Sequence, residues 1–418
     1  MRNLVLLTSS FPYEGGEQFL ETEIQYWQNT GFDNIYVIPS SCNGEARYFP
    51  PEIKIINKRN VSHKLIYAIA AFFNIILYKE ILHIVKSHKV KEWVPNFITA
   101  LKNTAATLRE KNRLFSSLKF LSKDSNTIYC YWNDISFYAA CLLKEEGALD
   151  TVISRAHGFD VYKERRINEY MPLKRQLANY SNKIFLLSDG VVNYYKKNYN
   201  AELKKLGVAR LGVDIPLNIP SLKDNEKILT VLTLSYCVTV KQIDKIMDAV
   251  YKYAKINNSI QIEWTHIGGG PLYDELKQRA NKLTNVEKKL SIVFLGNIKN
   301  TDVKNHLESN YYDVFINASK SEGIPVSIME AMSYGIPAVA PDIGGIADLV
   351  GGTHGYLMPS SFSVDDIVAG IDTICNKKND FSYRENASKW VAKNFNSSIN
   401  YPQFVEEVER IVGINDPK

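Results

Sequence analysis

The segment YDVFINASKSEGIPVSIMEAMSYGIPAVAPD, residues 312–342, decides the fold class. It begins and ends with short apolar runs, 312–319 and 336–342, which are typical of strands buried on both faces of a parallel sheet. Between them Pro325 stands where a helix would begin, a position at which its missing N–H is not needed. A strand, a helix and a second strand in this order predict one βαβ step of a parallel sheet.

The same alternation of apolar runs and helical patterns extends over the rest of the chain. The further runs are 3–10, 33–40, 127–132, 151–157 and 183–188 in a first series, and 228–235, 260–268 and 290–296 in a second. Segment 214–227, with two prolines and a polar run, separates the two series and is typical of a linker. We therefore expect an α/β protein of two Rossmann-like, doubly wound domains that face each other across a cleft.

The expected domain boundaries follow from this alternation. The first domain should cover residues 1–215, and the second should cover residues 225–385. Residues 386–418 should form a helical segment, with a last helix near 401–412 that packs back on the first domain.

Composition places the chain among ordinary globular proteins. With 418 residues, 45% hydrophobic and 23% charged, it is neither disordered nor a disulfide scaffold, and it is too long for one compact core. Its five cysteines are scattered singly, which favours a reducing compartment and argues against a zinc site. No stretch approaches the ~20 apolar residues of a membrane span, and the first residues resemble a strand more than a signal peptide, so we expect a cytoplasmic protein.

The net charge of +5 is unevenly distributed. Between Lys54 and Lys123 there are fourteen Lys or Arg residues and three acids, and this part includes the apolar run 65–78, flanked by Lys64 and Lys79. That run is too short to span a bilayer and suits a buried or an interfacial helix. It is either a core helix beside a solvated basic segment or a peripheral contact with an anionic membrane surface. Nucleic acid is not an expected partner, because no recognised module accompanies the charge.

The loop and helix after residue 319 have the features of a diphosphate site. The first N–H groups of the helix, around 326–329, have no intrahelical partner and can bind an anion. Glu322 precedes this helix and Glu330 lies about one turn inside it, and carboxylates hold sugar hydroxyls well because each offers two acceptor oxygens. Alternatively, Glu330 only stabilises the helix N-terminus. The following turn, Gly344-Gly345, should let the backbone approach a ligand closely.

Residues 319–349 resemble the donor-binding signature of the retaining, GT-B-fold glycosyltransferases of family 4, the glycogen-synthase-like and bacterial polysaccharide group. The resemblance implies that Glu322 contacts the donor sugar as a catalytic residue and that Glu330 binds the ribose hydroxyls. The backbone that would hold the diphosphate is that of Gly323, Ile324, Pro325, Val326 and Ser327.

Other segments resemble the family in the same order along the chain. SSFPYEGGEQFLETEI (9–24) is similar to its N-terminal glycine loop, with Gly15 and Gly16 near the phosphates and acceptor, although a simple turn is the alternative. ISRAHGFDVY (153–162) is similar to the histidine loop, which implies a sugar contact for His157 and a loop shaped by Arg155 and Asp160. THIGGGPLYDELK (265–277) resembles the family's glycine turn, and VFLGNI (293–298), with Asn297, its base-binding loop.

One segment departs from the family pattern. The family has a Gly-Arg-Leu run and then a lysine, and both cations hold the donor diphosphate. In LSYCVTVKQID (234–244), Lys241 fits the lysine, but Ser235 and Tyr236 stand where the glycine and arginine are expected. The loss of one charge-assisted hydrogen bond is worth roughly 1.5–3 kcal/mol. Another basic residue, such as Arg155, could replace the missing cation in donor binding.

The resemblance implies transfer of a hexose or hexosamine from a nucleotide sugar to a hydroxyl, with retention of configuration through an oxocarbenium-like state. It also implies that the first domain, 1–215, binds the acceptor and that the second, 225–385, binds the nucleotide sugar. No D-x-D motif is present, so neither a metal nor another cofactor is expected. The basic segment favours a lipid-linked saccharide as the acceptor, as in cell-surface polysaccharide assembly at the inner face of the membrane. The alternatives are a non-catalytic partner subunit, a sugar-nucleotide epimerase of the same fold, and a glycoside hydrolase, which has no need of a diphosphate site.

Overall fold

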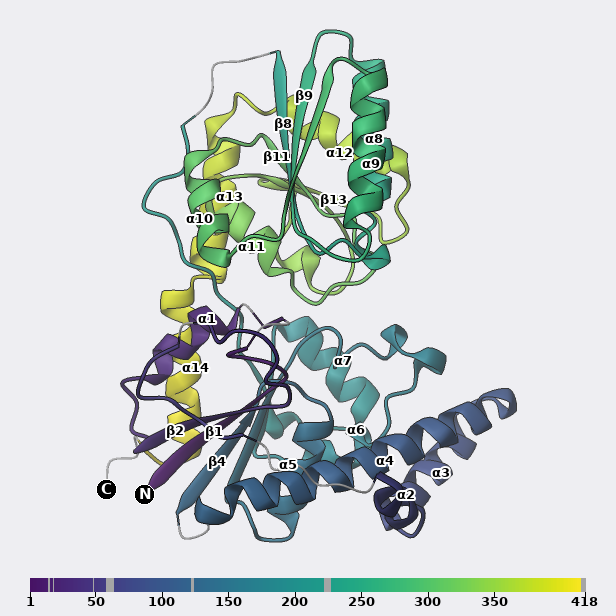
Figure 1. The fold of residues 1–418 in the computed structure, drawn as a ribbon, viewed down its shortest axis with the longest axis vertical. Helices are drawn as coiled ribbons and strands as arrows, with labels where there is room; N and C mark the ends of the chain where they lie inside the picture. The colour runs from purple at the N-terminus through teal and green to yellow at the C-terminus, as the bar shows by residue number, and fades with distance from the viewer. Residues whose placement is uncertain are drawn as a thin grey trace. The chain divides into compact units, whose positions relative to one another are not determined.

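The computed structural model describes residues 1–13, 16–17, 19–47, 49–57, 64–121, 124–221 and 227–414. The chain forms two compact units, each with its own sheet and helices (Figure 1). Unit 1 consists of Met1–Arg210 and Tyr401–Lys418, and unit 2 of Leu211–Asn400. Residues 386–400, which we expected in the segment returning to the first domain, therefore belong to unit 2.

Unit 1 is built on a seven-stranded sheet in the order β3-β2-β1-β4-β5-β6-β7, with all neighbouring strands parallel. The strands are β1 (Arg2–Thr8), β2 (Asn34–Pro39), β3 (Lys54–Ile55), β4 (Ser125–Cys130), β5 (Thr151–Ala156), β6 (Lys183–Leu186) and β7 (Leu206–Val208). The order runs outward in both directions from β1 and β4. The change of winding direction, where doubly wound sheets bind ligands, therefore lies between these two strands.

Helices cover both faces of this sheet (Figure 1). They are α1 (Leu20–Glu23), α2 (Lys64–Phe72), α3 (Ile75–Ser87), α4 (Val90–Leu118), α5 (Ile135–Glu145), α6 (Lys174–Leu177), α7 (Asp189–Tyr199) and α14 (Ser397–Ile411). Alternate side chains of β1 point to opposite faces, with Val5 in the core formed with α4, α5 and α7, and Leu6 in the core formed with α1 and α14. Phe404 and Val408 of α14 are buried in that second core, so the end of the chain completes unit 1.

The apolar run 65–78, expected as one helix, is two helices in the structure. α2 ends at Phe72, and α3 begins after Asn74, whose side chain accepts the N–H of Ile76 at 3.0 Å. Asparagine is among the best N-cap residues, which explains the break. The two helices are bent by 62°, and within the described residues no single helix is long and apolar enough to cross a membrane.

Unit 2 is built on a six-stranded parallel sheet in the order β10-β9-β8-β11-β12-β13. The strands are β8 (Ile228–Leu234), β9 (Gln261–Ile267), β10 (Leu290–Gly296), β11 (Val314–Ile316), β12 (Ala338–Pro341) and β13 (Gly355–Met358). The helices are α8 (Ile243–Ile256), α9 (Tyr273–Val286), α10 (Asn300–Ser309), α11 (Val326–Ser333), α12 (Val364–Cys375) and α13 (Phe381–Asn394). Here the change of winding direction lies between β8 and β11. The predicted α/β class with two doubly wound sheets is confirmed.

Candidate functional site

The expected donor-binding residues of unit 2 gather at one edge of its sheet. Because all the strands are parallel, the loops after β8, β9, β10, β11 and β12 leave the sheet at its carboxyl edge. These loops, together with the first turns of α11, hold all the expected residues of this unit. They are Lys241, Asn297, Glu322, Gly323, Ile324, Pro325, Val326, Ser327 and Glu330.

Lys241 and Glu322 meet at the point where the winding direction changes. Lys241 lies in the loop after β8 and Glu322 in the loop after β11, and the Lys241 ammonium contacts Oε1 of Glu322. The backbone N–H of Lys320 donates to the carbonyl of Val240 at 2.8 Å and holds the two loops together. Lys241 is 22% exposed and Glu322 11%, so both side chains reach solvent. An ammonium and a carboxylate are thus available together at the place where this fold binds ligands.

The start of α11 is open to a ligand. Pro325 is its N-cap residue, and no side chain caps the helix. The N–H groups of Ile328 and Met329 bond to the Pro325 carbonyl, at 3.2 and 3.4 Å. The N–H groups of Val326 and Ser327 are in the first turn and have no intrahelical acceptor. The positive end of the helix dipole therefore begins at Pro325, three residues after Glu322. This arrangement favours the binding of an anion.

The turn after β12 supports the Glu322 loop. Gly345 donates its N–H to the carbonyl of Gly323 at 2.7 Å. Gly344 has a φ of +59°, and a Cβ added there would lie 2.1 Å from the carbonyl oxygen of Glu322. We expected these glycines to let the backbone approach a ligand. The structure shows that they let it approach the loop that carries Glu322.

Replacing Gly344 with alanine should therefore displace Glu322. The substitution combines an unfavourable φ with a backbone clash, so we expect a loss of about 1–3 kcal/mol in the free energy of unfolding. Binding of the nucleotide sugar that the sequence leads us to expect should weaken in the same variant, measured by calorimetry on folded protein. Gly352→Ala is the matched control, since a Cβ at Gly352 would meet nothing within 4 Å. Equal effects of the two substitutions would contradict this role.

The glycine turn after β9 has a similar supporting role. A Cβ on Gly268 would lie 1.9 Å from the carbonyl oxygen of Ser235, in the loop after β8. A Cβ on Gly269 would lie 3.2 Å from the Cβ of Asn297, which is in the loop after β10. The turn thus packs these loops closely together at the sheet edge. Tyr236, which stands where the resemblance expects an arginine, is 56% exposed on the same loop as Ser235.

Glu330 has an unusual protonation equilibrium. Burial raises the pKa of the Glu330 carboxyl to about 7, with Lys304 opposing the rise and Asp214 adding to it. Lys304 is itself paired with Asp214 at 2.5 Å, which limits its effect on Glu330. Glu330 is therefore poised between its neutral and ionised forms near neutral pH, a condition often met at functional sites.

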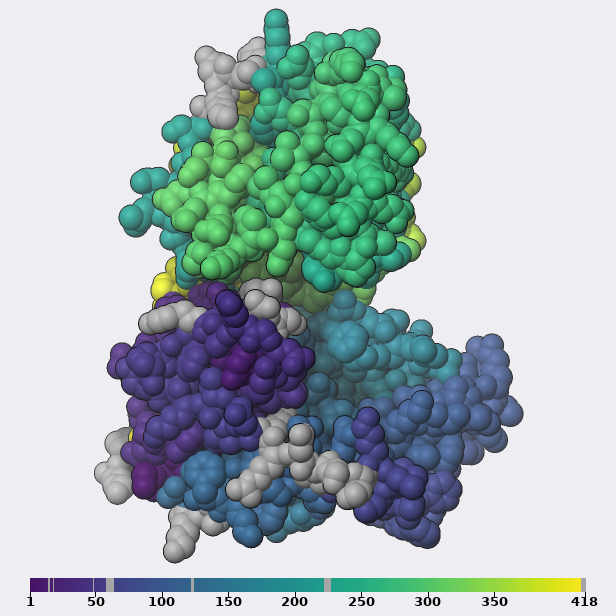
Figure 2. All heavy atoms as spheres, in the orientation of Figure 1, coloured from purple at the N-terminus to yellow at the C-terminus, as the bar shows by residue number. Residues whose placement is uncertain are grey.

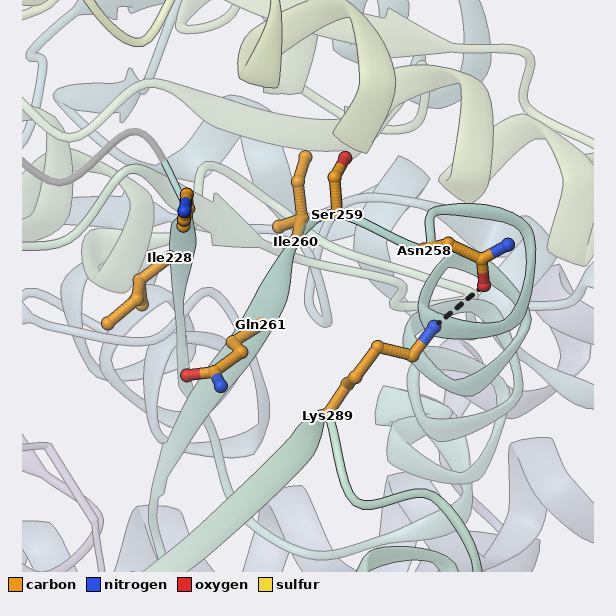
Figure 3. Close-up of a pocket in the computed structure, with 7 residues that line it drawn as sticks. Ile228, Asn258, Ser259, Ile260, Gln261 and Lys289 are labelled. Atoms are coloured by element: carbon orange, nitrogen blue, oxygen red, sulfur yellow. Dashed lines mark hydrogen bonds between the residues drawn. The ribbon is translucent and has the colours of Figure 1, made fainter.

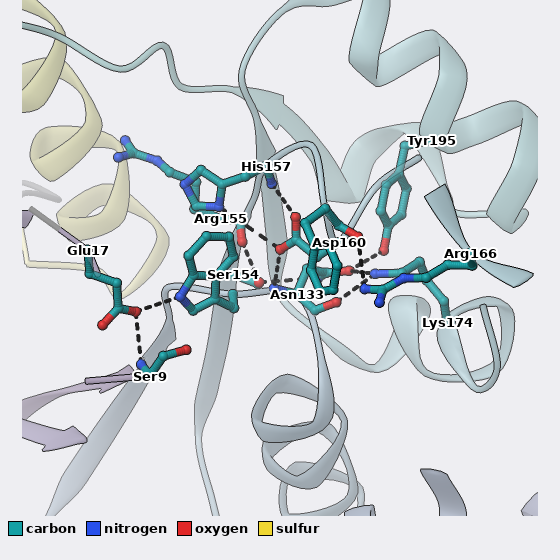
Figure 4. Close-up of polar contacts among 12 residues, drawn as sticks. Ser9, Glu17, Asn133, Ser154, Arg155, His157, Asp160, Arg166, Lys174 and Tyr195 are labelled. Atoms are coloured by element: carbon teal, nitrogen blue, oxygen red, sulfur yellow. Dashed lines mark hydrogen bonds and ion pairs between the residues drawn. The ribbon is translucent and has the colours of Figure 1, made fainter. Parts of the chain in front are cut away.

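In unit 1, the loop after β1 folds around the carboxylate of Glu17 (Figure 4). This carboxylate accepts the backbone N–H groups of Ser9 and Ser10 at 2.8 Å and of Phe11 at 2.7 Å. It also accepts the indole N–H of Trp132 at 2.5 Å, which joins the loops after β1 and β4. Glu17 was not among the residues expected to shape this loop. Its position directly after Gly15 and Gly16 is the only feature of the sequence that could have drawn attention to it.

Gly16 is one of the two glycines expected to bind ligand in this loop, and it lies next to Glu17. A Cβ added to Gly16 would meet nothing within 4 Å. Gly15, the other, lies outside the described residues.

His157 lies in a box of aromatic side chains. Its ring centroid is 4.7 Å from those of Tyr131 and Trp132 and 6.2 Å from that of Phe19. The side chain is 9% exposed, and neither ring nitrogen has a hydrogen-bond partner among the described residues. Asp160 Oδ2, at 4.0 Å from Nδ1, is too distant for a hydrogen bond. His157 thus has two unused polar atoms in an apolar surrounding.

Burial also fixes the charge of His157. It lowers the pKa of the imidazole to about 4, although Asp160 acts in the opposite direction and Arg155 adds to the lowering. At neutral pH the ring is uncharged, so one nitrogen donates and the other accepts. This pair suits the hydroxyl groups of a sugar.

A buried polar network holds the loops around His157 (Figure 4). Asp160 accepts the backbone N–H groups of His157 at 2.6 Å and of Asn133 at 2.7 Å. Lys174 donates to the Asn133 carbonyl at 2.6 Å, and Tyr195 to the Asn133 Oδ1 at 2.8 Å. Burial lowers the pKa of Lys174 to about 8. The network ties the loops after β4 and β5 to α6 and α7, and only Asp160 in it was foreseen from the sequence.

Arg155 departs from the expected donor-binding role. Its guanidinium is fully buried, pairs with the fully buried Glu23 at 2.5 Å, and lies 4.2 Å from the ring centroid of Phe404 on α14. Tyr129 donates to the other oxygen of Glu23 at 2.9 Å. A buried cation that is already paired is not available to a diphosphate. Arg155 instead joins β5, α1 and α14 inside unit 1, and it does not replace the arginine missing at Tyr236.

Two further observations delimit the site. Within the described part of the chain, no group of three or more His, Cys, Asp and Glu is placed to hold a metal ion.

A cavity of about 370 Å³ in unit 2 is lined by residues that include Ile228, Gln261 and Lys289 (Figure 3). Lys289 contacts Asn258 there at 3.3 Å. These residues lie at the amino ends of β8, β9 and β10, at the sheet edge opposite to Lys241 and Glu322. The cavity is therefore separate from the candidate site.

Comparison with known proteins gives the same architecture for the whole chain. The lipopolysaccharide outer core galactosyltransferase WaaB is 15% identical, with a TM-score of 0.67, over 99% of this chain and 100% of its own. Anabaena HepE in complex with UDP and glucose is 15% identical, with a TM-score of 0.63, over 97% and 99%. The chain has the GT-B fold.

The second GT-B unit also matches known sequences. Residues 214–393 match the family model "Glycosyl transferases group 1". The Escherichia coli O-antigen biosynthesis glycosyltransferase WbnH is 32% identical over 136 residues, which are 32% of this chain and 36% of that protein. The Escherichia coli UDP-Gal:alpha-D-GlcNAc-diphosphoundecaprenol alpha-1,3-galactosyltransferase is 24% identical over 60% of this chain and 66% of its own length. The alignment thus covers about a third of the length of the first relative and about two thirds of the length of the second.

Proposed function

We propose that this protein is a retaining glycosyltransferase that transfers a hexose or hexosamine from a nucleotide-diphosphate sugar to a hydroxyl group. The observation that carries the proposal is the contact of Lys241 with Glu322 beside the uncapped start of α11. It combines a cation, free helix N–H groups and a carboxylate at the edge where a doubly wound sheet binds its ligand.

The diphosphate would lie at the start of α11. The N–H groups of Val326 and Ser327 would donate to phosphate oxygens, and Lys241 would supply a positive charge. An ammonium has three donors, so Lys241 can keep its contact with Glu322 and still bind a phosphate. As the bond to the sugar breaks, negative charge grows on the leaving phosphate, and these fixed donors stabilise it.

Each unit offers one side chain that suits sugar hydroxyls, a carboxylate in unit 2 and an imidazole in unit 1. Glu322, held in place by Lys241, would accept hydroxyl hydrogens and stabilise the positive charge of the oxocarbenium-like state. His157 would offer its neutral ring to hydroxyls. The leaving phosphate would take the proton of the incoming hydroxyl on the same face, which preserves the anomeric configuration. In this scheme no metal takes part.

The acceptor that we propose is a lipid-linked saccharide in the assembly of a cell-surface polysaccharide, at the cytoplasmic face of the membrane. Two relatives support the proposal by their names, one as an O-antigen biosynthesis glycosyltransferase and one as an enzyme acting on a diphosphoundecaprenol-linked sugar. The basic segment from Lys54 to Lys123 would favour an acceptor with an anionic lipid carrier.

One observation favours a second candidate, a non-catalytic partner subunit of another transferase. Tyr236 replaces the expected arginine, and the buried Arg155 does not compensate for it. A donor site with one cation fewer would bind the diphosphate more weakly.

A screen of nucleotide sugars tests both candidates. UDP-, GDP- and dTDP-sugars are added to the full chain and its melting temperature is followed, since a ligand of the native state raises it. The stabilising donor is then incubated with lipid-linked saccharides and product is detected by mass spectrometry. Stabilisation with transfer supports the enzyme, and stabilisation without transfer supports the partner subunit. No stabilisation by any nucleotide sugar would contradict both.

The donor should also bind in a pH-dependent manner through Glu330. Ionised Glu330 accepts the ribose hydroxyls well, so donor affinity should rise with pH through the pKa of about 7. From about pH 8 to about pH 6 the ionised fraction, and with it the affinity, should fall roughly tenfold. Calorimetric titration with a nucleotide-diphosphate sugar measures the change. Glu330→Gln should remove this dependence, and an unchanged slope in that variant would argue against ribose binding by Glu330.

A further inference from the structure

The outer side of α2, α3 and the first turns of α4 is unusually apolar. Among the described residues, twelve of the twenty-eight exposed large hydrophobic side chains lie between residues 65 and 98, and we call these twelve the apolar face. Phe73 is the most exposed of them, at 79%. α2 and α3 both pack on α4, and the three helices form a lobe at one side of unit 1 (Figures 1 and 2). Single exposed apolar residues are normal, but a cluster of this size marks an interaction surface.

α3 shows that the exposure is systematic. Ile75, Tyr78, Leu82 and Val85 are all exposed and follow one another at spacings of three, four and three residues. At about 100° per residue, these side chains form one stripe along the helix. An amphipathic surface helix normally has polar residues on the side away from the core, and here that side is apolar.

The opposite side of α3 holds the helix firmly on unit 1. Leu77 and Ile84 are buried there, and Glu80 lies between them. The Glu80 carboxylate accepts the hydroxyl of Tyr170 at 2.6 Å and the backbone N–H of Leu173 at 3.1 Å. The outward stripe is therefore presented by an anchored helix.

Positive charges border the apolar face. The lysines exposed in this region are Lys64, Lys79, Lys86, Lys89 and Lys91. Lys79 and Lys86 are seven residues apart, which places both along one edge of the α3 stripe. Both acids of residues 64–98 are engaged, Glu80 as above and Glu92 with His88 at 3.5 Å. No described acidic side chain lies within ion-pair distance of the five lysines.

We propose that the apolar face docks on the surface of an anionic lipid bilayer and lies in its interface. Apolar side chains would enter the acyl region while the bordering lysines meet anionic head groups. A second copy of this chain is a poor occupant, because a two-fold contact would bring the lysines against one another. Within the described residues no single helix is long and apolar enough to cross the bilayer, and the anchoring of α3 through Glu80 and Leu173 places α3 on unit 1 rather than in a span. The proposal does not depend on the glycosyltransferase function.

Flotation with vesicles of phosphatidylglycerol and phosphatidylcholine in equal parts tests the docking. The full chain should bind these vesicles, bind pure phosphatidylcholine vesicles much more weakly, and dissociate from the anionic vesicles as salt rises. Phe73→Ser with Leu82→Ser should reduce binding by more than about tenfold. Lys79→Gln with Lys86→Gln should reduce it by about fivefold for each lysine.

Matched controls separate the apolar face from exposure in general. Leu203→Ser removes an exposed hydrophobic residue of unit 1 outside the apolar face, and Lys196→Gln with Lys197→Gln removes two exposed lysines of α7. Neither should change vesicle binding. The proposal is overturned if the wild type does not bind anionic vesicles, or if the face variants bind as well as the controls. A dimer found by sedimentation would also overturn the proposal, if Phe73→Ser with Leu82→Ser dissociated that dimer and the lysine and control variants did not.

Discussion

Replacing Glu322 with alanine should reduce the rate of sugar transfer by about a hundredfold to a thousandfold, the usual effect of removing one preorganised charge from a transition state. Glu322 is held in place by Lys241 and by the backbone packing of Gly344. The variant should still fold, because the side chain is partly exposed and its ion pair is worth little to stability. Steady-state kinetics with the donor found by the screen measures the loss.

The control for this substitution is Glu308→Ala, which removes an exposed carboxylate of α10 in the same unit. It should leave the transfer rate unchanged. Lys241→Ala should mainly weaken donor binding, because Lys241 is assigned to the diphosphate. Full activity of the Glu322→Ala variant would remove Glu322 from the proposed site.

Replacing Arg155 with methionine should destabilise unit 1 by about 3–5 kcal/mol, because it leaves the carboxylate of Glu23 buried without its cation. It should also loosen α14, since Phe404 loses the guanidinium that packs on its ring. Denaturant unfolding, followed by the fluorescence of the buried Trp27 in this core, measures the change.

Two comparisons make the Arg155 result specific. Arg155→Met with Glu23→Leu removes both charges and should recover much of the lost stability. Glu146→Ala breaks the surface pair with Lys111 and should change stability by at most about 1 kcal/mol. If Arg155→Met left the free energy of unfolding unchanged and lowered only donor affinity, the sequence-based assignment would be preferred over the structural one.

The fold could be predicted well because buried parallel strands leave a clear trace in the sequence. All ten apolar runs expected as strands are strands in the structure, such as 228–235 for β8 and 290–296 for β10. The short strands β3, β7 and β13 were not predicted, because no apolar run longer than the strand surrounds them in the sequence, as it does for the similarly short β6, β11 and β12. The left-handed conformation of Glu17, whose carboxylate lies inside the preceding loop, was not foreseen either, and α1 begins only after it, at Leu20.

The candidate site could be predicted only where local sequence limits the geometry. Pro325 at the start of α11 sets the position of the helix end and its free N–H groups, and both were foreseen. The partners of charged residues depend on contacts between distant segments, and the sequence gives no sign of them. Arg155 and Glu23 are 132 residues apart, and only the folded chain shows that they neutralise each other. The same holds for the lysine at position 174, which is buried under the loops around His157.

The two-part composition of unit 1 affects the order in which the protein can fold as the ribosome releases it. Unit 2 is one continuous stretch, Leu211–Asn400, whereas the core of unit 1 needs Phe404 and Val408. At roughly 5–20 residues per second, the ribosome needs tens of seconds after Arg210 to deliver these side chains. During that interval the apolar surface beneath α14 lacks its cover. The half that is synthesised first is therefore the last to become complete, and the nascent chain is exposed to aggregation in the meantime.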